Sequence, residues 1–242
     1  MSSNKTLYEG KAKKILKGPS KDTLIQVFKD DATAYNKKKH KIFNGKGILN
    51  NKISEHIMLY LRSKGIETHF KKRLNDREQL IKKCEIIPIE FVVRNVVAGS
   101  IANKLSLKEG TKLKKPLLEY YYKEDSLDDP MISRDHVEAF GWATKSELKK
   151  IDKISTKINK LLISLFAKKK IVLVDFKIEF GRIKENNKIN IILADEISPD
   201  SCRLWDKESL EKLDKDRFRK NLGGLIDAYK EVATRLGIDF QN

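Results

Sequence analysis

The sequence predicts a protein that combines antiparallel strands with amphipathic helices, and its 242 residues suffice for one large domain or for two lobes that share a cleft. The strands are indicated by residues 171–181, where polar and apolar side chains alternate, and by 189–194, an apolar run that completes a hairpin. The helices are indicated by apolar residues at helical spacing in 49–64 and 146–168.

Composition excludes several classes of protein. No stretch approaches 18 apolar residues, so we expect no membrane association, and the N-terminus lacks the apolar region of a signal peptide. Cys84 and Cys202 match no zinc or redox spacing, which favours free thiols in a reducing cytoplasm. The net charge of +17 comes from 51 lysine and arginine residues, of which 10 are arginine. Because the lysines are spread over the chain, we expect no nucleic-acid partner, but a field that attracts anionic small molecules.

The N-terminal residues 6–28 predict a strand, a bend at Gly10, and further strands, the last over 23–28. Lys11 and Lys13 fall on one face of an extended segment beside this glycine, an arrangement that can cradle phosphates. A solvated lysine pair is the alternative.

Residues 30–47 are polar and basic, and the glycine-rich loop expected there covers residues 44–47. The helix that follows, 49–64, has Asn50 or Asn51 near its N-cap and Gly65 just beyond its C-terminus. Residues 66–74 are expected to contain strand.

Residues 84–97 predict a long apolar strand that carries Glu90 and Arg94 on one face. A buried arginine needs an anion, so either Glu90 pairs with Arg94 or a ligand carboxylate or phosphate does. Gly99 and Ser100 add a backbone amide and a hydroxyl for the same anion.

The remaining segments alternate between loop and helix. Residues 105–144 are expected to be mostly irregular, Ser146 to cap a helix that ends near residue 168, and residues 206–236 to be helical, with Leu222 on the packed face and Gly237 at the end.

The strand at 171–181 holds the main candidate site. Asp175, Lys177 and Glu179 share a face, opposite a strongly apolar one. A turn centred on Asn186–Asn187 would place Glu179 opposite Ala194 or, one residue further, Asp195.

Two carboxylates at that spacing repel unless a cation lies between them, and Mg²⁺ prefers oxygen ligands. A loop at 198–205 adds Asp200 and Arg203, which together indicate a phosphate and metal site. A solvated edge strand is the alternative.

Seven motifs, taken in their order and spacing, cover essentially the whole chain. Two are long, 86–100 (IIPIEFVVRNVVAGS) and 173–181 (LVDFKIEFG), and the shorter ones lie at 7–13, 44–47, 198–206, 214–219 and 222–225. The chain resembles the SAICAR synthetase family. The resemblance implies a two-lobed α+β fold related to ATP-grasp and kinase-like nucleotide binders. A β-rich lobe, 1–88, and an α+β lobe, 89–242, would enclose a cleft.

The resemblance also implies the reaction in which ATP, CAIR (a carboxylated aminoimidazole ribonucleotide) and L-aspartate give SAICAR, ADP and phosphate. It implies a cytoplasmic homodimer. A small-molecule kinase on the same fold is the alternative. Ser201 stands where the family usually has glycine, so a different turn is expected there.

The family's site residues carry over by motif. Those expected to contact ATP are Lys11, Lys13, Glu90, Val92 and Lys123, with residues 90–92 as the hinge beside adenine. Those expected to bind CAIR are Arg94, Ser100, Lys177, Asp200, Arg203 and Arg219. Those expected to hold Mg²⁺ are Glu179 and Asp195, and those expected to be catalytic are Lys177 and Asp175, which orients Lys177 or the substrate amine. L-Aspartate is placed near Ser100 and residues 128–135.

Overall fold

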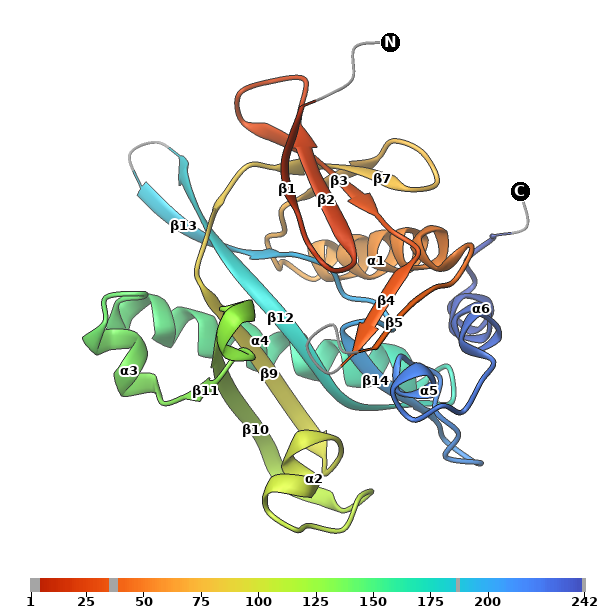
Figure 1. The fold of residues 1–242 in the computed structure, drawn as a ribbon. Coiled ribbons are helices and arrows are strands. Elements are labelled where there is room, and N and C mark those ends of the chain that lie inside the picture. The colour runs from red at the N-terminus through yellow and green to blue at the C-terminus, as the bar shows by residue number, and fades with distance from the viewer. Residues whose placement is uncertain (1–4, 35–38, 186–187, 241–242) are drawn as a thin grey trace.

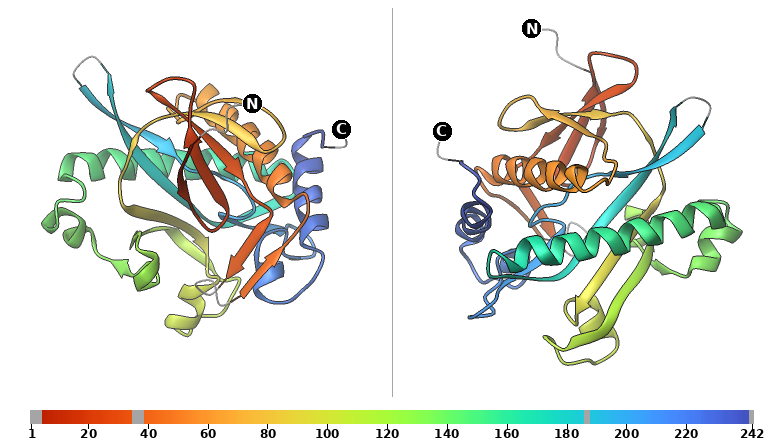
Figure 2. Two further views of the ribbon diagram at one scale, coloured as in Figure 1. Left: turned by 45° about the horizontal axis from the view of Figure 1, so that its top comes forward. Right: turned by 180° about the vertical axis from the view of Figure 1, so that it is seen from behind.

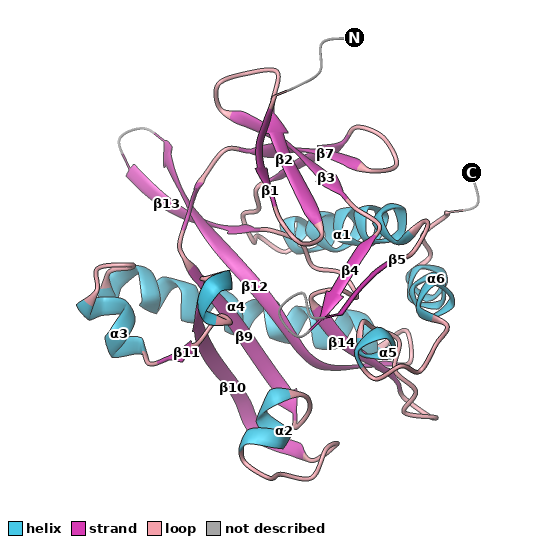
Figure 3. Ribbon diagram, viewed as in Figure 1, coloured by secondary structure: helices cyan, strands magenta, loops and turns pink. Residues whose placement is uncertain are grey.

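The computed structural model describes residues 5–34, 39–185 and 188–240, which form three antiparallel sheets flanked by helices (Figures 1 and 3). The first sheet has the strand order β1-β2-β3-β7-β6. Its strands are β1 (Thr6–Glu9), β2 (Lys13–Lys17), β3 (Thr23–Phe28), β7 (Glu78–Lys82) and β6 (Phe70–Arg73). All of them fall within residues 1–88, the segment expected to form the β-rich lobe.

The second sheet is organised around one long strand, β12 (Ile171–Glu185). The order is β11-β10-β9-β12-β13, and β8 and β14 also pair with β12. The partners are β8 (Glu85–Ile86), β9 (Ile89–Val96), β10 (Lys112–Tyr122), β11 (Met131–Ile132), β13 (Lys188–Ala194) and β14 (Cys202–Asp206). The third sheet is the hairpin of β4 (Asp31–Ala34) and β5 (Lys39–Ile42).

The two longest helices lie on the side of the sheets away from the viewer in Figure 1. The view from behind in Figure 2 shows α4 (Lys145–Ala167) crossing the back of the second sheet, with α1 (Lys46–Ser63) above it. The shorter helices are α2 (Ser100–Lys104), η1 (Asp125–Leu127), α3 (Arg134–Ala139), α5 (Asp216–Arg219) and α6 (Leu225–Leu236). None of the described helices is long and apolar enough to cross a membrane.

One hydrophobic core joins the two large sheets. Buried residues of α1, such as Ile53 and Ile57, belong to the same cluster as Ile158 of α4 and Phe176 of β12. Helix α6 packs against α1, so the C-terminal part of the chain closes onto the N-terminal part. The predicted stripe of α4 is confirmed, since the helix buries Leu148, Ile151, Ile158 and Leu162 in this core.

The two long helices begin elsewhere than the sequence predicted. Helix α1 starts at Lys46 after Gly45, whose φ of 85° suits glycine, so Asn50 and Asn51 are buried inside the helix. Helix α4 is capped by Thr144, which forms a reciprocal capping box with Glu147, so the Ser146 cap is wrong by two residues.

Two stretches expected to be irregular contain strands instead, the first being the segment 105–144, which contains β10 and α3. The polar segment 30–47, in which the sequence predicts only the loop 44–47, also contains the strands β4 and β5. The pairing of β10 with β9 is interrupted between Lys112 and Leu117, the stretch containing Pro116, which explains the absence of a clear alternation. In the predicted 198–205 loop, residues 202–206 form β14.

The C-terminal segment is helical only in part. In 206–236 the structure has the short α5 and α6, and Leu222 is exposed between them, contrary to prediction. Gly237 ends α6 as expected, with a φ of 78°.

Candidate active site

A cavity of about 1060 Å³ lies between the first and second sheets. The β1–β2 hairpin, β3 and β7 contribute to one wall, and β9, β12, residues 195–203 and α5 contribute to the other. Every residue predicted for the site lines this cavity except Ser100, which contacts one that does. Strands distant in sequence therefore bring the predicted residues together.

Lys177 stands at the centre of a group of acids on the second sheet. Its Nζ lies 2.9 Å from Glu90 Oε1, 2.7 Å from Glu179 Oε1 and 3.3 Å from Asp195 Oδ2. Glu179 pairs with Ala194 in the β12–β13 register, the first of the two predicted alternatives, while the Asn186–Asn187 turn lies outside the described residues. Part of the positive charge expected between Glu179 and Asp195 is thus supplied by Lys177, which lies on the same strand as Glu179.

Two further lysines reach these carboxylates. Lys123, which follows β10, places its Nζ 2.5 Å from Glu179 Oε2, and Lys13 of β2 forms an ion pair with Asp195 across the cavity. Lys13 also lies 3.0 Å from Glu196. We call Lys13, Lys123, Lys177 and the acids Glu90, Glu179 and Asp195 the lysine cluster.

The lysines keep both central acids ionised. Burial raises the pKa of Glu179, but Lys177 and Lys123 outweigh it and hold this pKa below its ordinary value. At Asp195, burial likewise raises the pKa, but Lys13 and Lys177 outweigh this effect, so the pKa lies well below the usual range. Asp195 also has a φ of 58°, a left-handed conformation that is strained for a residue with a side chain and that ends the β13 pairing.

The described residues contain no group of three or more His, Cys, Asp or Glu side chains suited to a metal ion. Glu179 and Asp195 nevertheless offer two hard carboxylates in one cavity. Mg²⁺ is commonly held by one or two carboxylates when phosphate groups and water complete its shell, so this donor set fits it.

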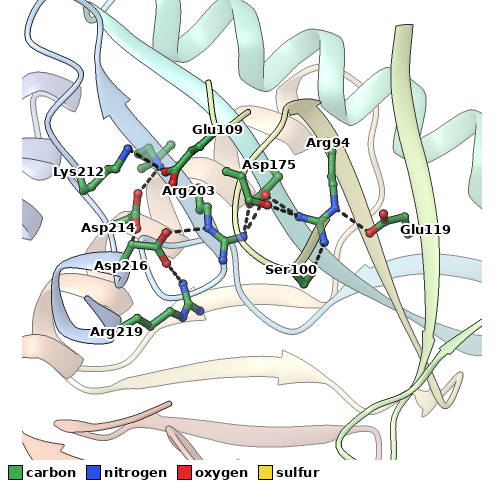
Figure 4. A network of polar contacts seen from close by, with 12 residues as sticks. Arg94, Ser100, Glu109, Glu119, Asp175, Arg203, Lys212, Asp214, Asp216 and Arg219 are labelled. Carbon is green, nitrogen blue, oxygen red and sulfur yellow. Dashed lines mark hydrogen bonds and ion pairs between the residues drawn. The ribbon is translucent and has the colours of Figure 1, made fainter. Parts of the chain in front are cut away.

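A second group of charged side chains, shown in Figure 4, is a network of arginines and acids. Arg94 of β9 places Nε 2.7 Å from Glu119 Oε2, Nη1 2.8 Å from Asp175 Oδ2 and Nη2 3.1 Å from Ser100 Oγ. The two predicted alternatives for the partner of Arg94 were Glu90 and a ligand, but in the structure the partners are Glu119 and Asp175. Glu119 belongs to β10, which the sequence did not predict, and Asp175 faces Arg94 in the β9–β12 pairing.

The network continues through Arg203 of β14. Its Nη1 lies 3.0 Å from Asp175 Oδ2, and its Nε lies 2.9 Å from Asp216 Oδ2. Asp216 Oδ1 in turn accepts a hydrogen bond of 2.6 Å from Arg219 Nη1. Burial raises the pKa of Asp216, but Arg203 and Arg219 outweigh it, so the pKa lies below its ordinary value. We call Arg94, Arg203, Arg219 and the acids Glu119, Asp175 and Asp216 the arginine network.

Arg203 is also fixed by close packing. A Cβ on Gly99 would lie 2.3 Å from Arg203 Nη2, so only glycine fits there. Ser201 does not displace Arg203 from the cavity, and its Oγ accepts the Ser198 N–H at 3.1 Å.

Two expected arrangements differ in the structure. Asp175 contacts the guanidinium groups of Arg94 and Arg203, while Lys177 contacts other acids, so Asp175 does not orient Lys177 here. Residues 90–92 lie inside β9, between β10 and β12, and the link from the first sheet to the second is instead residues 83–84, between β7 and β8.

The sequence analysis missed several polar side chains at or beside the cavity. Lys46, fully buried at the start of α1, places Nζ 2.6 Å from Asp200 Oδ2, and Tyr229 OH lies 2.5 Å from Asp200 Oδ1. Lys215 and Glu196 line the same wall. No local pattern distinguishes Lys46 and Lys215 from the many lysines on the surface. Asp216 could have been found, because it belongs to the short motif at 214–219.

Comparisons with known proteins point to one family. The family model for SAICAR synthetase matches residues 6–236. The phosphoribosylaminoimidazole-succinocarboxamide synthase of Sinorhizobium fredii (strain NBRC 101917 / NGR234) is 59% identical over 242 residues, which is 100% of this chain and 95% of the relative.

Solved structures are similar throughout. The phosphoribosylaminoimidazole-succinocarboxamide synthase of Ehrlichia chaffeensis superposes with a TM-score of 0.96 at 50% identity, covering 98% of this chain and 100% of that one. A SAICAR synthetase (type-2) in complex with ADP gives a TM-score of 0.92 at 47% identity, covering 97% and 99%.

Proposed function

Because the chain belongs to the SAICAR synthetase family, we propose that its cavity joins L-aspartate to CAIR, with ATP converted to ADP and phosphate. The observation that carries this proposal is that the family motifs, far apart in sequence, converge on one cavity. The enzyme is thus an ATP-dependent ligase of purine biosynthesis.

The chemistry requires activation of a carboxylate. The carboxylate of CAIR attacks the γ-phosphorus of ATP, the bond to ADP breaks, and an acyl phosphate forms. The amine of L-aspartate then attacks the acyl carbon, phosphate leaves, and the nitrogen loses a proton. Phosphoryl transfer asks the protein mainly for positioning and for neutralisation of charge.

The lysine cluster, together with Lys11, would supply that neutralisation. Lys11 and Lys13 extend from the β1–β2 hairpin, where they would contact the phosphates of the nucleotide. Glu179 and Asp195 would hold Mg²⁺, which when bound offsets the negative charge of the phosphates. Lys177, which contacts both acids, would meet the CAIR carboxylate as it becomes phosphorylated.

The arginine network supports a fixed site for CAIR. Arg94, Arg203 and Arg219 present guanidinium groups that bind phosphate and carboxylate in pairs of hydrogen bonds. Their orientation is set by Asp175 and Asp216 before any ligand arrives. Residues 1–88 and 89–242 would act as two lobes around this site, in a cytoplasmic homodimer.

The test is a coupled assay of ADP release. ADP release that requires L-aspartate, CAIR and Mg²⁺ together is the expected result. ADP released equally without L-aspartate, or a phosphorylated product that accumulates, would instead identify a small-molecule kinase.

A further inference from the structure

Asp214 is a buried acid behind the wall of the cavity. It is 0% exposed and does not line the cavity, whereas Arg203 and Arg219 do. Its two carboxylate oxygens accept backbone hydrogen bonds, Oδ2 from the Leu204 N–H at 2.8 Å and Oδ1 from the Asp216 N–H at 2.7 Å. One side chain therefore ties β14 to the first residue of α5.

The two tied points belong to the arginine network. Leu204 directly follows Arg203 in β14. Asp216 accepts hydrogen bonds from Arg203 Nε at 2.9 Å and from Arg219 Nη1 at 2.6 Å. Figure 4 shows one arginine on each oxygen of Asp216, with Asp214 beside it. The separation of the two guanidinium groups thus depends on where Asp214 holds Asp216.

Helix α5 needs such support. It has only four residues, Asp216–Arg219, and Lys215 at its N-cap provides no side-chain hydrogen bond. A helix this short gains little from its own hydrogen bonds, and the N–H groups of its first turn have no partner inside it. Asp214 accepts one of these N–H groups, so the orientation of α5 and of Arg219 depends on this carboxylate.

The acid is present at a cost. Burial raises the pKa of Asp214 to about 7, and the neighbouring Asp216 adds to this effect, while the two N–H groups and Arg219 act in the opposite direction. Within the described ranges, no lysine or arginine forms an ion pair with it. An asparagine would avoid the buried charge, but it has one acceptor oxygen, and its NH2 group would face the second N–H donor. A carboxylate is therefore the side chain that satisfies both contacts.

We propose that Asp214 is a positioning residue for CAIR, which holds the guanidinium groups of Arg203 and Arg219 at a fixed separation without touching the ligand. The proposal rests on the proposed function, in which both arginines bind CAIR. Arg203 is also held by Asp175 and by its packing against Gly99, so a change at Asp214 should displace Arg219 more than Arg203.

The first test is steady-state kinetics of Asp214→Asn. We expect the KM for CAIR to rise by on the order of 10-fold because Arg219 is misplaced, with the KM values for ATP and L-aspartate within about twofold of wild type. Asp214→Ser, which keeps an acceptor for the Asp216 N–H only, is a second variant and should show the same selective rise. An unchanged KM for CAIR, or an equal rise for all three substrates, would overturn the proposal.

The matched control is Asp206→Asn. Asp206, at the end of β14, also accepts two backbone hydrogen bonds, from the N–H groups of Glu208 and Ser209 at 2.8 Å each. It lies outside the cavity and outside the arginine network, so all three KM values should stay unchanged. A rise in the KM for CAIR equal to that of Asp214→Asn would trace the effect to β14 as a whole and contradict the proposal.

A double variant tests whether Asp214 acts through Arg219. In protein that already carries Arg219→Met, the further change Asp214→Asn should raise the KM for CAIR by less than about threefold, since the guanidinium that it positions is gone. The same rise as in the wild-type background would show that Asp214 acts by another route, and the proposal would fail.

Direct binding distinguishes this proposal from the proposed function. CAIR is titrated by calorimetry into wild type and into Asp214→Asn. Weaker binding to the variant supports the proposal even where turnover fails. Equal binding to both proteins refutes the proposal and leaves the proposed function intact, whereas no binding of CAIR to wild type refutes both.

Discussion

The lysine cluster and the arginine network share one cavity and both use β12, yet they differ in the type of cation and in the elements that they join. Exposure varies within each group: the side chains of Lys13, Lys177 and Lys123 are 17%, 27% and 37% exposed, and those of Arg94, Arg203 and Arg219 are 3%, 17% and 30% exposed. The cluster also joins the two large sheets through Lys13 and Asp195, while the described contacts of the network stay within the second sheet, α2 and α5.

This difference teaches how one site can be both rigid and adaptable. A lysine ammonium can exchange one acceptor for another at little cost, whereas an arginine held by two acids has a fixed plane. We infer that the network is preorganised and that the cluster rearranges when phosphates enter.

The largest effect is expected from Arg94→Met. Removal of this guanidinium leaves Glu119 and Asp175 with less compensation in a buried place, which should lower the free energy of unfolding by about 3–5 kcal/mol. Urea denaturation measures it. Lys123→Met is the matched variant in the cluster and should cost about 1 kcal/mol or less. Equal losses would remove the distinction between the two regions.

Glu179→Gln tests the cluster through activity. The variant should keep its fold but lose on the order of 10²- to 10³-fold in kcat, because an amide cannot replace a carboxylate toward a cation. The loss should persist at every Mg²⁺ concentration in a titration. Turnover close to wild type would mean that the pair of acids is structural.

An ion pair between an arginine and a carboxylate outside the cavity tests what a guanidinium contributes away from the site. Arg182 Nε lies 2.6 Å from Glu147 Oε1, and this hydrogen bond is the main cause that lowers the pKa of Glu147 to about 2. A lowered carboxyl pKa stabilises the fold above a pH of about 4.5, and the contribution is lost as the pH falls toward 2.

Glu147→Gln should therefore cost about 1–2 kcal/mol at pH 7, a value reduced for partial exposure, and almost nothing near pH 2. Thermal unfolding over this pH range measures the difference. A cost that does not change with pH would assign the stabilisation to the α4 capping box alone.

The smallest effect is expected at the entrance of the cavity. Lys11 Nζ lies 2.7 Å from Asp125 Oδ1, an exposed pair that Lys11 must loosen to reach a phosphate. Asp125→Asn should lower the KM for ATP by no more than about threefold and change stability by less than about 0.5 kcal/mol. The effect should disappear at high salt, and a rise in KM would show that Asp125 itself assists nucleotide binding.

The sequence predicted the centre of the site because its signal is local. Alternation over 171–181 is enough to place Asp175, Lys177 and Glu179 on one face, and the hairpin register brings Asp195 close. The partners of Arg94 could not be predicted in this way, because Glu119 lies on a strand whose pairing is decided by β9.

The missed lysines show the same limit. Lys46 and Lys215 are two among many lysines, and what sets them apart is their burial in the folded chain, which no short sequence window reports. The corrected helix starts were within reach, since Gly45 and the Thr144–Glu147 pair are both recognised starting signals.

Strand β12 pairs with β8, β9, β13 and β14, whose residues span 85–206. Most of these pairings close long stretches of chain, so the second sheet gains its stability late in folding and as one unit. In native-state hydrogen exchange, the amides at the centre of β12 should therefore exchange last, through global unfolding, while those of β1 at the exposed edge exchange through local opening.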